Sequence, residues 1–428
     1  RIERGTNLVA TGELLPPPDA IVPNAEPCPP MAVVPLPTQA TPLTTAGWED
    51  MARKLYRRHL LAEGYLKDGH RDPAWDEDAI ALIDGFICFY VNPWQGMKDD
   101  RRRLALSQSI LDRGCRDPYV RFVHAMNLQM TGSGAEAKRI LDELVPTFAD
   151  PARPHAFMLF LLQYRCAHAG ERRLFMAAAQ TAFTRAATDG SFRPEELRRL
   201  IFYFTEHTYF VSHLFFHNDD TALLELVGRN PDLDPWFRET MLGYFHLHRA
   251  WREVWTQNFD PYDVRDWPAY AADLDAARQH LENAIAIDPN DPEPYRFLIR
   301  LARLAPHCNQ EEARRWFDRA IACQFDYMPA YEELIEAFRP SSGGSIQLLF
   351  DLGLACAQTR RYDTQVPDYV YRALEEIGAD TGNLHDILDA PGAAEALLDT
   401  AMAYVDRNVF RTRNLTRAAA VCWFFGDY

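Results

Sequence analysis

The residues best suited to chemistry in this sequence are two histidines, His213 and His217, four positions apart in an aromatic stretch. Side chains four apart lie on one face of a helix, and paired imidazoles are common ligands of zinc and iron. There is no HExxH motif around them and no third ligand at a fixed spacing. Histidines near a helix end more often satisfy backbone carbonyls. We therefore expect structural histidines and no metal, with a metal- or cofactor-binding enzyme using the His213/His217 region as an alternative.

Other signatures of catalysis are missing from the sequence. It contains no GxSxG nucleophile motif and no glycine-rich phosphate loop of the P-loop or dinucleotide type, and its eight cysteines include no CxxC pair. The segment Gly343-Gly344-Ser345 is more typical of a turn and helix N-cap than of an anion site. We expect a chain that is not an enzyme and that needs no cofactor.

The charge and hydropathy of the sequence argue against binding to nucleic acid and against a membrane span. The formal net charge of −16 opposes approach to phosphate-rich surfaces, so we expect no binding to nucleic acid. No apolar run approaches the ~20 residues needed for a membrane-spanning helix. Scattered cysteines favour a reducing compartment and a cytoplasmic location. Because the sequence begins with Arg1 rather than Met, export after removal of an N-terminal leader is the alternative.

The elements that must position any functional residue repeat at a shift of 36 residues. Small and large apolar residues occur at spacings of four, three and five, and the segments that follow them repeat as well. The first set is Ala277, Leu281, Ala284 and Pro289, answered by Ala313, Phe317, Ala320 and Phe325; the second is Tyr295, Leu298, Ile299 and Ala302, answered by Tyr331, Leu334, Ile335 and Phe338. Residues at these spacings share one helix face, which predicts two copies of a helix pair. A single pair cannot bury such a face, so further pairs are expected outside 273–338.

The repeated residues resemble the tetratricopeptide repeat (TPR), whose second helix carries a small residue, an aromatic and alanine at these spacings. The region 251–374 also resembles an uncharacterised family of bacterial TPR-related domains, through Phe259, Ala284, Phe317, Tyr327 to Tyr331 and Gly343 to Ser345. The resemblance implies an all-α fold, a TPR-like α-solenoid in which antiparallel helix pairs form a right-handed superhelix. It supplies no catalytic residues.

The rest of the chain fits a helical solenoid preceded by an arm. Ten prolines within residues 1–46 exclude helix and central strand, so this stretch is an extended Pro-rich arm that binds either its own chain or another subunit. Ser133 and Glu136 match a capping box before a helix. The expected organisation is an arm (1–46), an irregular helical-repeat region (47–255), a connecting loop (256–268), clear TPR-like repeats (269–340) and C-terminal helices (341–428). Helices are expected at 99–113, 117–130, 134–148, 345–358, 367–378, 392–407 and 411–425.

The sequence favours a protein–protein interaction scaffold that holds a peptide or partner subunit in a concave groove. The helices at 293–304 and 328–338 would line that groove, which makes five residues candidates for partner binding: Tyr295, Arg296, Arg300, Tyr331 and Glu332. The two tyrosines also occupy repeat packing positions, so a purely structural role is open for them. A rival hypothesis is a structural subunit of a large assembly or filament, in which residues 1–46 reach the next copy.

Overall fold

The structure is a computed structural model that describes residues 53–91, 100–150, 227–256, 268–305, 309–381, 392–407 and 411–425, with a few isolated residues between 156 and 225. The predicted arm at 1–46, the His213/His217 pair and residues 257–267 of the predicted connecting loop lie outside these segments. By its backbone contacts the chain divides into units Arg1–Val34 and Pro35–Tyr428, and every described residue lies in the second unit.

All regular elements among the described residues are helices, which confirms the all-α prediction for this part of the chain. The first group comprises η2 (Arg57–Tyr65), α2 (Leu66–Asp68), α3 (Asp76–Val91), α4 (Asp100–Asp112), α5 (Pro118–Met130) and α6 (Gly134–Phe148). Of these, η2 is a π-helix, which the sequence pattern did not predict. An added Cβ at Gly64 in η2 would lie 2.6 Å from the Tyr119 ring of α5, so this glycine permits the close contact between the two helices.

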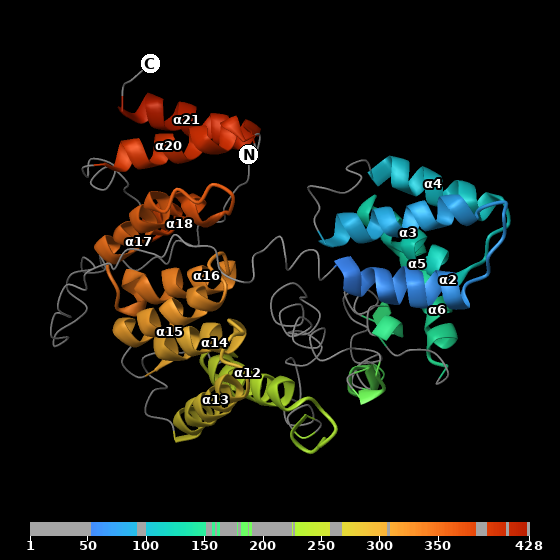
Figure 1. The fold of residues 1–428 in the computed structure, drawn as a ribbon, viewed down its shortest axis with the longest axis horizontal. Helices are drawn as coiled ribbons and strands as arrows, with labels where there is room; N and C mark the ends of the chain where they lie inside the picture. Colours follow the sequence, from blue (N-terminus) through green and yellow to red (C-terminus); the bar gives the residue numbers. More distant parts are fainter. Residues whose placement is uncertain are drawn as a thin grey trace, which may run out of the picture. The chain divides into compact units, whose positions relative to one another are not determined.

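The second group contains the predicted repeats at 269–340 and the helices on either side of them. It comprises α12 (Pro235–Thr256), α13 (Pro268–Ile287), α14 (Glu293–Leu304), α15 (Gln310–Cys323), α16 (Met328–Phe338), α17 (Ile346–Gln358), α18 (Tyr369–Thr381), α20 (Ala393–Asp406) and α21 (Arg411–Phe425). Each helix packs against the next one in the sequence (Figure 1). Contacts also join α12 to α14, α14 to α16 and α17 to α20. The helices beyond residue 340 were thus predicted to within a few residues at each end.

The 36-residue shift is visible in the packing. The stripe Ala277, Leu281 and Ala284 is completely buried, and so is the equivalent stripe of α15. The alanines allow neighbouring helices to approach closely while the larger side chain fills the space between them. Equivalent side chains also make equivalent hydrogen bonds, because the Tyr295 hydroxyl donates to the Pro289 carbonyl at 3.0 Å and the Tyr331 hydroxyl donates to the Phe325 carbonyl at 2.8 Å.

A third stripe occurs at the same shift in α17, where Leu349, Gly353 and Cys356 are buried. A Cβ added to Gly353 would lie 3.0 Å from the Ala373 Cβ of α18, so the glycine brings these helices together as the alanines do in α13 and α15. The spacing of four and three appears once more in α20, in the buried residues Leu397, Ala401 and Tyr404. These residue types differ from the first two copies, which is why the sequence pattern did not reveal them.

Other buried tyrosines join helices through backbone carbonyls. The Tyr270 hydroxyl donates to the Leu304 carbonyl at the end of α14, at 2.6 Å. The hydroxyls of Tyr371 and Tyr404 each donate to a carbonyl at 2.7 Å, on Leu397 and Thr364 respectively. Each bond satisfies a polar group that burial would otherwise leave unpaired, so these tyrosines add directional links to the apolar packing.

Local capping explains several helix starts and corrects one prediction. The Ser345 hydroxyl accepts a hydrogen bond from the Leu348 N–H at 3.1 Å, so it is the N-cap of α17 as expected. Gly343 has a φ of 81°, a left-handed conformation that suits glycine. The predicted capping box at α6 is wrong: Ser133 makes no side-chain cap, and the Glu136 carboxylate instead pairs with Arg139 at 2.6 Å.

Candidate functional site

Among the described residues, a series of ion pairs joins α14, α16, α18 and α21. In α16, the Glu333 carboxylate accepts a 2.7 Å hydrogen bond from Arg300 Nε and lies 3.7 Å from Arg303. Both arginines belong to α14, and the Glu333 side chain is only 8% exposed. Burial opposes ionisation of Glu333, but the two arginines outweigh it and lower the pKa of this carboxyl. Glu333 therefore ties α16 to α14 as a charged group.

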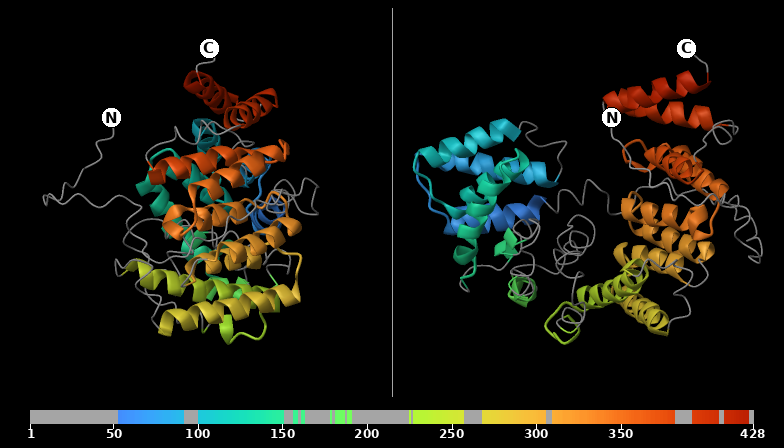
Figure 2. Two further views of the ribbon diagram at one scale, coloured as in Figure 1. Left: turned by 90° about the vertical axis from the view of Figure 1, so that its left-hand side faces the viewer. Right: turned by 180° about the vertical axis from the view of Figure 1, so that it is seen from behind.

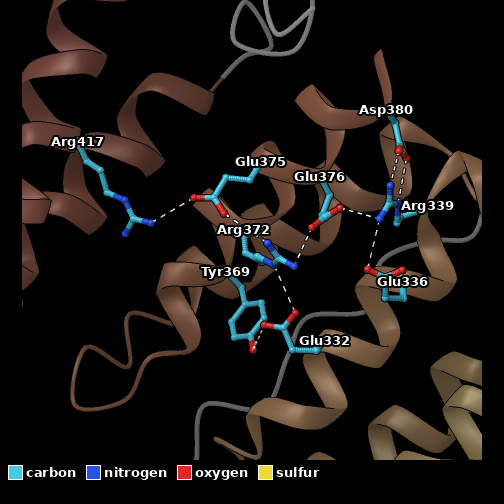
Figure 3. A network of polar contacts seen from close by, with 9 residues as sticks. All are labelled: Glu332, Glu336, Arg339, Tyr369, Arg372, Glu375, Glu376, Asp380 and Arg417. Atoms are coloured by element: carbon cyan, nitrogen blue, oxygen red, sulfur yellow. Dashed lines mark hydrogen bonds and ion pairs between the residues drawn. The ribbon is translucent and has the colours of Figure 1, made fainter. Parts of the chain in front are cut away.

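The preceding residue, Glu332, connects α16 to α18 (Figure 3). Its carboxylate lies 3.0 Å from the Tyr369 hydroxyl and 3.4 Å from Arg372 Nε. Arg372 also pairs with Glu376 at 2.8 Å, four residues further along α18. The Tyr369 hydroxyl additionally lies 3.1 Å from the Met328 carbonyl, and burial raises the pKa of this tyrosine well above its ordinary value.

Arg339, just beyond the end of α16, is the centre of a second set of pairs (Figure 3). It pairs with Asp380 of α18, lies 2.8 Å from Glu376 and lies 3.5 Å from Glu336. The hydrogen bond to Asp380 is the main reason that the pKa of this guanidinium is raised. In the middle of α18, Glu375 lies 3.7 Å from Arg417 of α21. We call these residues the ion-pair network: Arg300, Arg303, Glu332, Glu333, Glu336, Arg339, Arg372, Glu375, Glu376, Asp380 and Arg417.

Exposure divides the network into fixed and accessible groups. Glu333, Glu376 and Asp380 are at most 14% exposed and hold their arginines in place. Glu332 is 48% exposed and Glu375 59% exposed. Ion pairs at such exposure contribute little stability, ~0–1 kcal/mol, because water already solvates both charges. The free-energy cost of breaking the ion pairs at Glu332 and Glu375 is therefore small.

The five predicted binding residues fall into two groups. Arg300 is 24% exposed and Glu332 48% exposed, and both belong to the ion-pair network. Tyr295 and Tyr331 are buried and bonded to backbone carbonyls, which is the packing role left open for them. Arg296 is also fully buried, pairs with Glu293 at 2.7 Å and stacks over the Phe297 ring. Arg296 is therefore part of the helix packing and is not at a surface.

The sequence did carry a signal for the network residues that were missed. The position of Arg300 becomes Glu336 and then Arg372 after successive shifts of 36 residues. Arginine and glutamate thus alternate at equivalent positions of α14, α16 and α18, which brings opposite charges onto neighbouring helices. The polar positions thus carry a repeat signal at the same shift as the apolar stripes.

Two polar clusters elsewhere bear on possible catalysis. In the first, the Ser107 hydroxyl lies 2.9 Å from His124 Nδ1, and both side chains are buried. The same hydroxyl donates to the Leu104 carbonyl at 2.9 Å, so it also has a partner in its own helix backbone. Burial lowers the pKa of His124. This geometry is a satisfied pair within the helix packing rather than an activated nucleophile.

The second cluster joins α12 to α13. His246 and His280 stack with ring centroids 5.6 Å apart and planes within 10°. Each Nδ1 lies 2.8 Å from a carboxylate, on Asp273 and Glu239 respectively. Carboxylates orient metal-binding histidines in this way, yet the part of the chain that the structure describes brings together no group of three or more metal-ligating side chains. No described helix is long and apolar enough to cross a membrane.

Comparison with known proteins adds no further constraint on the site. No family model matches the chain, and no curated protein shows significant similarity to it. The resemblance to the TPR thus depends on the repeated residues alone.

Proposed function

We propose that this chain is a non-enzymatic helical-repeat scaffold of TPR type, which binds a protein or peptide partner on the face that carries the ion-pair network. The observation that carries the proposal is the repetition of contacts at a shift of 36 residues. Tyr295 and Tyr331 make the same hydrogen bond in successive helix pairs, and the stripes of α13 and α15 are buried in the same way. Stacked pairs of this kind form a right-handed superhelix whose first helices line a concave surface.

The chemistry of the accessible groups supports a partner with basic side chains. The more exposed part of the ion-pair network is acidic. Its side chains with at least 36% exposure are the carboxylates Glu332, Glu336 and Glu375 and one arginine, Arg372. The chain as a whole is also acidic, with a net charge of −16, so long-range attraction favours a basic partner. Lysine or arginine side chains of an extended peptide would pair with Glu332 and Glu375.

A peptide-binding experiment tests this proposal. Fluorescence anisotropy with labelled peptides rich in lysine and arginine should show binding that weakens as salt increases, whereas acidic peptides of equal length should not bind. The double variant Glu332→Gln/Glu375→Gln should weaken binding about tenfold or more. The matched control is Glu282→Gln/Glu311→Gln, which removes two exposed carboxylates from α13 and α15. Equal losses in both variants would show non-specific attraction and would reject the proposed surface.

A further inference from the structure

Two carboxylate–histidine pairs bridge α12 and α13 in a reciprocal arrangement. Each helix carries an acidic residue and a histidine seven positions later on the same face: Glu239 and His246 in α12, and Asp273 and His280 in α13. The histidine of each helix contacts the carboxylate of the other, with Nδ1 2.8 Å from the nearer oxygen. This crossed pairing requires antiparallel helices, and Figure 2 shows α12 (yellow-green) lying against α13 (yellow). The two imidazole rings therefore stack between two carboxylates, with centroids 5.6 Å apart.

Close packing fixes the distance between these two helices. A Cβ added to Gly243 of α12 would lie 2.7 Å from Leu281 Cγ and 3.3 Å from the Ala277 carbonyl of α13. Leu247 and Ala250 of α12 are also fully buried. The two backbones thus approach closely, and a repulsion between the stacked rings acts directly on the helix contact.

The charges of this cluster balance when both imidazoles are neutral. The Asp273 carboxylate accepts a 2.7 Å hydrogen bond from Arg249 Nε, and the Glu239 carboxylate lies 3.4 Å from Arg238. Two negative groups thus face two positive ones. All four of these side chains, and the two imidazoles, are at most 31% exposed, so water screens an added charge incompletely.

Both carboxylates stay ionised while the histidines take up protons. Burial opposes ionisation of Asp273 and Glu239, but hydrogen bonds, above all those from His246 and His280, outweigh it and lower the pKa of both carboxyls. Histidines in proteins bind protons at ~pH 5–8, where these carboxyls are charged. Protonation therefore adds charge to a balanced cluster, and among the described residues neither imidazole has an ion pair with a further carboxylate. The second proton places two imidazolium rings face to face, where like charges repel.

The charged groups of the neighbouring helix α14 have partners of their own. This helix packs on both α12 and α13. Its Arg296 pairs with Glu293, and its Arg300 and Arg303 pair with Glu333 of α16. In the described part of the chain, the ion pairs that reach the two imidazoles thus come from α12 and α13 alone.

We propose that double protonation of His246 and His280 weakens the packing of α12 on α13, which makes this contact a pH-sensitive switch. The first proton is accommodated because a carboxylate flanks each ring, whereas the second adds the repulsion between the rings. The unfolded chain binds both protons without that repulsion, so it binds more protons than the folded contact does and stability falls as pH falls. The contact is intact at neutral pH and loosens toward pH ~5. This response is independent of peptide binding by the ion-pair network, which involves other residues.

Hydrogen–deuterium exchange of the full chain, measured by mass spectrometry, tests the proposal. After correction for the intrinsic pH dependence of amide exchange, protection of α12 and α13 should fall at least about tenfold between about pH 7.5 and 5. Peptides from α17 should keep their protection over this range. The double variant His246→Gln/His280→Gln retains a side-chain donor for each carboxylate but binds no proton, so its protection should be the same at both pH values.

The matched control is His70→Gln, which removes an exposed imidazole outside this contact. It should lose protection of α12 and α13 in acid as the unmodified chain does. A second measurement follows the imidazole resonances by NMR and needs only single substitutions. His246 and His280 should take up protons in two separate steps, whereas the ring that remains in His246→Gln or His280→Gln should titrate in one step.

Several outcomes would overturn the proposal. One is protection of α12 and α13 that stays constant or rises as pH falls, because the carboxylates would then outweigh the repulsion between the rings. Another is an equal loss of protection in the double variant, which would place the acid-sensitive group elsewhere. Independent single-step titration of both histidines in the unmodified chain would show that the stacked rings do not interact electrostatically, and would also reject it.

Discussion

The Tyr295 hydroxyl donates a 3.0 Å hydrogen bond to the carbonyl of Pro289, six residues earlier. This bond ties α14 to the turn that follows α13, and its equivalent between Tyr331 and Phe325 ties α16 to the turn that follows α15. The two bonds fix the angle at which each helix pair leaves the previous one. Repetition of a directional contact, together with repetition of apolar residues, makes successive pairs structurally equivalent.

Removal of one of these hydroxyls should destabilise the chain. Tyr331→Phe leaves the buried Phe325 carbonyl without its donor, so we expect the free energy of unfolding to fall by about 1–3 kcal/mol. Tyr295→Phe should cost less, because the Tyr295–Pro289 bond is partly accessible to solvent. Urea denaturation followed by circular dichroism measures both. Unchanged midpoints in both variants would contradict the structural role of the repeated bond.

Buried tyrosines should make the chain sensitive to alkali. Burial raises the pKa values of Tyr295, Tyr331, Tyr369, Tyr371 and Tyr404 above the ordinary 10.0. Such groups retain their protons longer in the folded state, so their contribution is complete below pH 10 and is lost as pH rises further. Each tyrosine adds up to ~1.4 kcal/mol per pH unit to the slope. Urea midpoints measured from pH 8 to 11 should be level and then decline, less steeply in Tyr331→Phe.

Glu333 should stabilise the fold in a pH-dependent way. Glu333→Gln removes the charge that pairs with Arg300 and Arg303, and we expect a loss of about 1–3 kcal/mol at neutral pH. Because the pKa of Glu333 is lowered from its ordinary 4.5, its contribution is present above pH 4.5 and disappears as pH falls below that value. The stability difference between the variant and the unmodified chain should therefore shrink between pH 5 and 3. The control Glu282→Gln, at an exposed position of α13, should show no such difference.

Glycine positions in two helices should respond in opposite ways to alanine. A Cβ at Gly243 in α12 would lie 2.7 Å from Leu281 Cγ, and Leu281 is fully buried. The resulting overpacking costs about 1–3 kcal/mol, which outweighs the gain in helix propensity of up to ~1 kcal/mol. Gly85 in α3 has no atom within 4 Å of the added Cβ, so Gly85→Ala should be neutral or stabilising. Thermal unfolding of both variants measures the contrast, and a stabilised Gly243→Ala would contradict the close packing of α12 on α13.

Helix positions were the part of the fold that the sequence predicted well. Capping residues and periodic apolar stripes act locally, so the ends of α17 and α21 match the prediction closely. The stripe of α17 was missed because Gly353 replaces a large residue, and its close contact depends on Ala373 in another helix. The sequence pattern also did not predict the π-helical geometry of η2, which packs against α3 and α5.

The candidate surface was predicted only in part. Arg300 and Glu332 lie in the ion-pair network and stay predicted partner contacts, but Arg296 is buried beside Glu293. Spacing along a helix gives the direction of a side chain, whereas burial depends on the neighbouring helices and on whether a long side chain finds a partner inside. For the same reason the stacked pair His246 and His280, from different helices, has no signature in the sequence.

The links between α16 and α18 include the partly buried hydrogen bond from the Tyr369 hydroxyl to the Met328 carbonyl and the exposed pair of Glu332 with Arg372. Dissolved ions weaken the second and leave the first intact. Higher ionic strength should therefore weaken the Glu332–Arg372 pair, whereas the hydrogen bond of Tyr369 to the Met328 carbonyl should keep its strength. The contact between α16 and α18 thus combines one interaction that salt screens with one that it does not.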